Sequence, residues 1–113
     1  MKLYLAKITT RFEGYHCWAQ APEMVSFLRN KHRHIFHVTV LIEQEHDDRD
    51  IEYIMTKWDL DNLIKKMKTD LKTYVEGTAS CEMMAEYIYD NITIGRNVEV
   101  EVLEDGENGA IVK

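Results

Sequence analysis

The sequence predicts an α+β fold, in which an antiparallel sheet is covered on one face by two helices. Apolar and polar residues alternate at residues 34–43 and 97–104, which indicates strands buried on one face. Between them, at residues 59–75 and 80–92, apolar residues recur every three or four positions, as in amphipathic helices. The 113 residues contain no low-complexity or linker segment, so one domain spanning residues 1–113 is expected.

The N-terminal third of the chain predicts two strands separated by a loop. Residues 2–17 are rich in residues that favour strands, such as Tyr4, Ile8 and Phe12. Residues 18–31 show no clean period and contain the only proline, which predicts a long loop with room for a short helix. The second strand, at residues 34–43, is expected to bury its even-numbered face.

The remainder predicts the helices and a closing hairpin. The acidic stretch at residues 43–50 indicates a solvated turn, and a short strand is expected at residues 51–55. The first helix is expected to end before Gly77, and the second to begin after the N-cap residue Ser80. A hairpin turn at residues 105–109 leads into a returning strand at residues 110–113. Apart from the short strand, the expected order is ββααββ.

The composition of the chain indicates which kinds of partner and which cellular location to expect. The net charge is −6 and no cluster of Lys and Arg occurs, which disfavours nucleic acid. No apolar run approaches the ~20 residues of a membrane helix, and the start of the chain turns polar too soon for a signal peptide. A cytoplasmic protein without a membrane partner is therefore expected. Cys17 and Cys81 form no CxxC pair and are expected to be free thiols.

Three histidines form a candidate metal site. His32 and His34 lie two residues apart at the start of a strand, so their side chains point to one face about 6–7 Å apart. His16 lies where the first strand ends, and an antiparallel partner would bring it beside His32. Three imidazoles leave a fourth tetrahedral position open, as in catalytic zinc sites. Histidine also packs or caps without a metal, so the spacing by itself leaves a chance arrangement open.

Several motifs, in order along nearly the whole chain, resemble those of the 6-pyruvoyltetrahydropterin synthase family, which includes 6-carboxytetrahydropterin synthase. Residues 12–16 (FEGYH) are similar to its F-x-x-x-H motif, and residues 32–36 (HRHIF) to its H-G-H-x-[FY] motif. Asp59, Leu60 and Leu63 match a D-F-x-x-L segment loosely, and residues 79–82 (ASCE) resemble P-T-[ST]-E. Residues 98–104 resemble the closing strand, whose terminal Glu anchors the pterin.

The resemblance implies the tunnelling fold, or T-fold, in which ββααββ subunits assemble into a homo-oligomeric barrel. It implies a Zn²⁺ ion that holds and acidifies the oxygens of a pterin side chain. It also implies a glutamate that accepts hydrogen bonds from the pterin ring, which is a strong and directional pairing. Metal binding is thereby assigned to His16, His32 and His34, and ligand binding to Glu104, with Glu82 as a helper and Cys81 and Ser80 as weaker candidates.

The chain departs from the family at its proton-transfer residues. The family's Cys before the HGH motif has no counterpart in residues 26–31, and Arg33 replaces the middle Gly. The family also has an Asp-His pair after the first helix. Asp70 matches the Asp of this pair, but no residue here matches the His. A positioned general acid or base is typically worth ~10²–10⁴ in rate, so these losses bear directly on activity.

Three interpretations follow. The first is a divergent zinc-dependent lyase acting on a dihydroneopterin triphosphate-like pterin, with zinc-bound hydroxide, Glu23 or Asp70 taking the missing role. The second is a catalytically altered member that binds a pterin or purine-like ligand without turnover. The third is an oligomer in which zinc serves stability alone. Biopterin, folate and deazaguanine (queuosine) biosynthesis share the scaffold, so the pathway stays open.

Overall fold

The computed structural model describes residues 1–72, 77–93 and 96–113. It shows an α+β chain with a ββααββ order of strands and helices, as the sequence predicts. The elements are β1 (Tyr4–His16), the 3-10 helix η1 (Glu23–Arg29), β2 (His32–Gln44), α1 (Tyr53–Asp70), α2 (Cys81–Asn91), β3 (Val98–Glu104) and β4 (Asn108–Val112).

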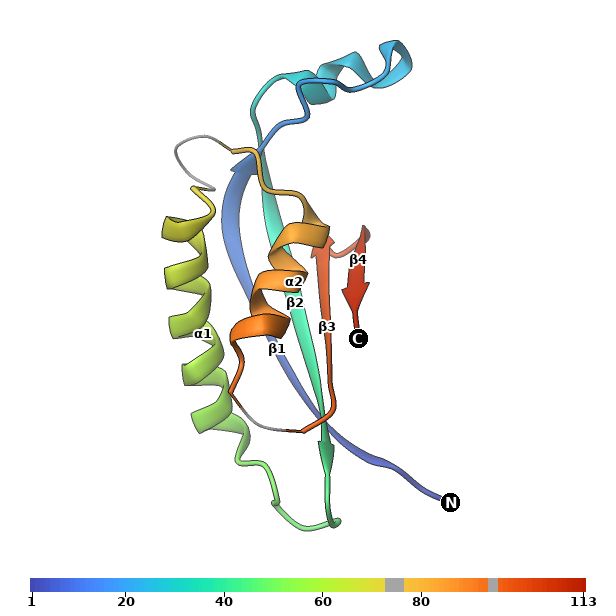
Figure 1. Ribbon diagram of the computed structural model, residues 1–113, viewed down its shortest axis with the longest axis vertical. Helices are drawn as coiled ribbons and strands as arrows, with labels where there is room; N and C mark the ends of the chain where they lie inside the picture. Colours follow the sequence, from blue (N-terminus) through green and yellow to red (C-terminus); the bar gives the residue numbers. More distant parts are fainter. Residues whose placement is uncertain (73–76, 94–95) are drawn as a thin grey trace.

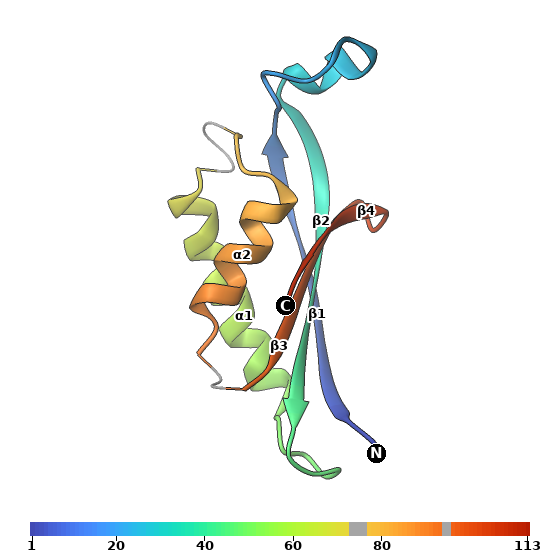
Figure 2. The ribbon, with the colours of Figure 1, turned by 45° about the vertical axis from the view of Figure 1, so that its right-hand side comes forward.

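The four strands form one antiparallel sheet in the order β1-β2-β3-β4. Both helices lie on the same face of this sheet (Figures 1 and 2). The predicted alternation is confirmed along the middle of β2 and β3, where the even-numbered side chains are buried in the core. The largest fully buried side chains of the core are Phe36, Val38, Val40, Ile42, Leu60, Met67, Met84, Ile88, Val100 and Val102.

The second helix begins where the sequence predicts. The Ser80 hydroxyl accepts a hydrogen bond from the Met83 N–H at 3.1 Å, which caps α2. Gly77, with a φ of 65°, is the break expected between the helices. Within the described residues, no helix is both long and apolar enough to cross a membrane.

The first helix begins earlier than predicted, and the short strand expected at residues 51–55 is wrong. Glu52 caps α1 by accepting from the Met55 N–H at 2.6 Å, so Tyr53 already belongs to the helix. The side chains of Tyr53, Ile54 and Met55 in this first turn are exposed. The predicted end of this helix, at residue 75, lies outside the described residues.

The loop between β1 and β2 extends beyond the end of the sheet (Figures 1 and 2). Its base is closed by the Trp18 N–H, which donates to the Leu28 carbonyl at 2.7 Å. Its short helix η1 buries none of its residues, and Met24 is 95% exposed and Phe27 69% exposed. The long loop with a short helix is confirmed, and it rises directly from the strand ends that carry His16 and His32.

Candidate metal centre

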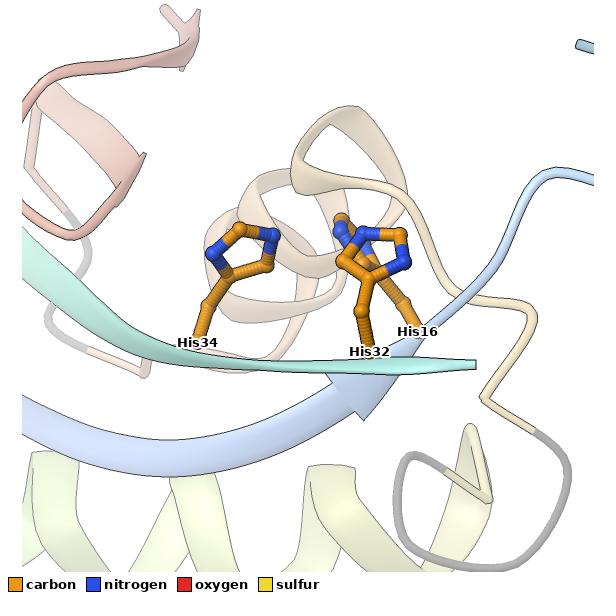
Figure 3. A group of neighbouring side chains, drawn as sticks. All are labelled: His16, His32 and His34. Carbon is orange, nitrogen blue, oxygen red and sulfur yellow. The ribbon is translucent and has the colours of Figure 1, made fainter. Parts of the chain in front are cut away.

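Strand register brings the three histidines together. In the antiparallel pair β1–β2, His16 lies opposite His32, and Gly14 lies opposite His34. The three rings stand on the same side of the sheet (Figure 3), and one ring nitrogen of each lies within 4.8 Å of the others. The predicted pairing of His16 with His32 is confirmed, and the group could hold a metal ion.

Each imidazole is oriented by an oxygen atom outside the group. Because these oxygens can only accept, each Nδ1 carries the proton and donates it, which leaves the lone pair on Nε2. Histidines that ligate metals show this arrangement, since the outer acceptor fixes both the ring and its tautomer. The contacts are His16 Nδ1 to the Ala79 carbonyl at 3.3 Å, His32 Nδ1 to the Asn30 carbonyl at 2.8 Å, and His34 Nδ1 to the Asp105 carboxylate at 2.7 Å.

The inward-facing nitrogens fit a metal ion. Among the described residues, the buried Nε2 atoms of His32 and His34 have no hydrogen-bond partner. A buried acceptor left without a partner costs about 1–3 kcal/mol, and a bound cation would remove this cost. Burial, partly opposed by the nearby Glu104 carboxylate, holds the pKa of His16 below its usual range. A neutral imidazole is the form that binds metal, and three neutral imidazoles are a donor set that suits zinc.

The Glu104 carboxylate faces the histidine group from the end of β3. Its Oε1 lies 3.3 Å from His16 Nε2, and its Oε2 lies 3.5 Å from His34 Nε2. The Cys81 thiol donates to Oε1 across 3.9 Å. Burial, and then the charges of Glu104 and Glu82, raise the pKa of Cys81 to about 12, so the metal-free protein holds this thiol protonated. Glu104 therefore lies directly against the histidines.

Asp105, which the sequence predicts only as part of the hairpin turn, also belongs to the site. While one of its carboxylate oxygens accepts from His34, the other accepts from the Ile35 N–H at 2.9 Å. The Ile35 N–H first, and then His34, hold the pKa of Asp105 below its usual range. A carboxylate is a common outer partner of a metal-bound histidine. The position of Asp105, directly after Glu104 in the sequence, was therefore the signal that could have identified it as a site residue.

A cavity of about 640 Å³ adjoins the histidine group. His16 and His32 lie on its wall, and Trp18 and Leu28 contribute apolar surface from the β1–β2 loop. This size is within the ~300–1,000 Å³ typical of small-molecule sites. The four residues that the sequence assigned to ligand binding also line it: Ser80, Cys81, Glu82 and Glu104.

The two residues suggested for proton transfer lie elsewhere. Asp70, at the end of α1, accepts a hydrogen bond from the Tyr87 hydroxyl of α2. The side chain of Glu23, in η1, is 90% exposed and pairs with Arg29 at 3.3 Å. Neither lines the cavity or belongs to the histidine group in the described part of the chain. The structure gives these two carboxylates local partners and does not bring them to the candidate centre.

Comparisons with known proteins assign no family to the chain. No protein-family model matches it. No curated protein matches it either. A function must therefore be inferred from the chemistry of the site itself.

Proposed function

We propose that this chain is a zinc-dependent protein of the 6-pyruvoyl/6-carboxytetrahydropterin synthase type, acting on a dihydroneopterin triphosphate-like pterin. The observation that supports this most is the set of three imidazoles. Their Nδ1 atoms all donate outward, and their ring nitrogens converge beside a cavity of about 640 Å³. Zinc bound there would supply Lewis-acid polarisation of ligand oxygens.

The lining of the cavity suits a flat heterocycle with hydrogen-bond donors on one edge. Trp18, Leu28 and Met83 offer apolar surface for the ring faces, while Glu82 and Glu104 offer acceptor oxygens. A carboxylate that faces two N–H donors makes short, directional hydrogen bonds. A pterin combines these features with side-chain oxygens that a metal can hold, which supports a pterin as the ligand class.

We also propose that the subunits have the T-fold and assemble into a homo-oligomeric barrel. The ββααββ order and the single helical layer support this fold. In the described structure, β1 and β4 each have one strand neighbour, which leaves the outer edge of each without a partner strand. Exposed strand edges favour pairing with another chain, and strand addition between subunits would satisfy both edges.

A second candidate function is pterin or purine-like ligand binding without turnover. The positions of Asp70 and Glu23, away from the cavity, favour it. The thiol that does line the cavity beside Glu104, Cys81, is held protonated and is a poor base. In this case the site would retain zinc and ligand affinity without the groups that move protons.

Turnover separates the two candidates. Zinc-loaded protein is incubated with dihydroneopterin triphosphate, with and without a chelator, and both product and bound pterin are measured. Product that forms only without the chelator would support the enzyme function. Bound pterin without any product would support the second candidate. Absence of both would overturn the proposed function.

The metal assignment has its own test in the zinc content of variants. His34→Ala is expected to remove stoichiometric zinc, because it deletes one of three converging nitrogens. His37→Ala, on the opposite face of β2, is the matched control and should keep the zinc content of the wild type. Zinc content unchanged in the His34 variant would exclude the histidine group as the metal site.

A further inference from the structure

The distances around Glu104 match those between ligands of one metal ion. In a tetrahedral zinc site with bonds of about 2.0–2.1 Å, neighbouring ligand atoms lie about 3.3–3.4 Å apart. Glu104 Oε1 lies 3.3 Å from His16 Nε2, and Glu104 Oε2 lies 3.5 Å from His34 Nε2. Each of the two carboxylate oxygens thus lies at about ligand-to-ligand distance from one histidine nitrogen, Oε1 from His16 and Oε2 from His34, beside the group of three histidines that could hold a metal ion.

The polarity of these contacts requires a positive species between them. His16 and His34 each donate a proton outward from Nδ1, so their Nε2 atoms present lone pairs to a carboxylate that also only accepts. Acceptors that face one another are unfavourable unless a cation or added protons lie between them. The ring nitrogens of His16, His32 and His34 already form a group that could hold a metal ion, so a metal cation is the species that fits between them.

We propose that Glu104 is the fourth ligand of the metal in the resting protein. The centre is then a closed site of three histidines and one carboxylate, and Cys81 positions the carboxylate through its thiol donor at 3.9 Å. This inference rests on the metal site of the proposed function. It differs from the open fourth position that the sequence predicts.

A closed centre makes ligand binding an exchange reaction. A ligand whose oxygens bind the metal would compete with the Glu104 carboxylate for the fourth tetrahedral position. The released carboxylate remains on the cavity wall, where it can accept hydrogen bonds from ligand N–H groups. Glu104 would thereby serve the metal before binding and the ligand afterwards.

The test uses Co²⁺ in place of zinc, because its visible spectrum reports the number and kind of ligands. The full chain and the variants Glu104→Gln and Glu104→Ala are loaded with Co²⁺ and titrated with azide, which binds at open metal positions. Glu101→Gln is the control, since it removes the same charge from the opposite face of β3. Thermal unfolding of the metal-free variants establishes that each one folds.

The wild type and Glu101→Gln are expected to share one spectrum that azide does not change. Both Glu104 variants should have an altered spectrum that azide shifts further, and zinc affinity lowered at least tenfold by chelator competition. Stoichiometric metal with the same spectrum, affinity and azide response in wild type and Glu104→Ala would overturn Glu104 as a ligand and leave the histidine site standing. A wild type that binds no metal would overturn both.

Discussion

Replacement of Asp105 by Asn should weaken zinc binding about tenfold. The Asn carbonyl can still accept from the Ile35 N–H, but its NH₂ group cannot accept from His34 Nδ1–H. The φ of 53° at this position is one that Asn adopts readily, so the turn is retained. The loss is therefore one charge-assisted hydrogen bond of 2.7 Å.

The magnitude follows from the exposure of that bond. Hydrogen bonds to charged groups contribute about 1.5–3 kcal/mol, but solvent screening lowers this where the partners are exposed. The Asp105 side chain is 46% exposed, which places its effect near the bottom of the range. About 1.4 kcal/mol is a factor of ten, which is also the lower limit seen for outer partners of metal ligands.

Zinc affinity is measured by competition with a chromophoric chelator, with Glu107→Gln as the control. Glu107 is exposed in the same hairpin, so its substitution removes the same charge without touching His34. Equal affinity in wild type and Asp105→Asn would refute the orienting role of Asp105. An equal loss in both variants would attribute the effect to net charge.

Two further predictions concern stability. Gly14→Ala should lower the free energy of unfolding by about 1–3 kcal/mol, because its Cβ would lie 2.9 Å from a ring carbon of the buried Phe36; an unchanged urea midpoint would contradict this. The Glu45 N–H and then the Arg96 guanidinium hold the pKa of Asp50 below its usual range. As the pH falls below about 4, the unfolded chain takes up this proton first, so the wild type loses stability there and Asp50→Asn loses less. Urea denaturation of both proteins across this pH range measures the effect. Identical pH profiles of stability would show that Asp50 does not cause the loss.

The fold was predictable where side-chain burial follows a local period. The strand β3 alternates from Val98 to Val102, and Leu60, Ile64 and Met67 recur at helical spacing, so sequence and structure agree there. The failure at residues 51–55 has a local physical cause. A strand was expected there, but the Glu52 side chain caps a helix that begins at Tyr53.

The site was predictable to the extent that it follows from strand parity and register. His32 and His34 share a face, and antiparallel pairing brings His16 opposite His32. The outer oxygens of His16 and His34 were hard to predict, because they depend on contacts between distant parts of the chain, whereas the Asn30 carbonyl that meets His32 is only two residues away. Asp105 is 71 residues from His34, and the Ala79 carbonyl that meets His16 carries no mark in the sequence.

The position of Glu104 bears both on how a metal ion would be held and on whether the protein is an enzyme. If Glu104 and the three histidines were to hold a metal ion together, the metal would supply Lewis-acid polarisation of ligand oxygens, and these oxygens would compete with the Glu104 carboxylate for it. Cys17 and Cys81 both line the cavity, and Cys81, whose thiol is held protonated, is a poor base. Turnover would also need a proton acceptor, and Asp70 and Glu23 lie away from the cavity.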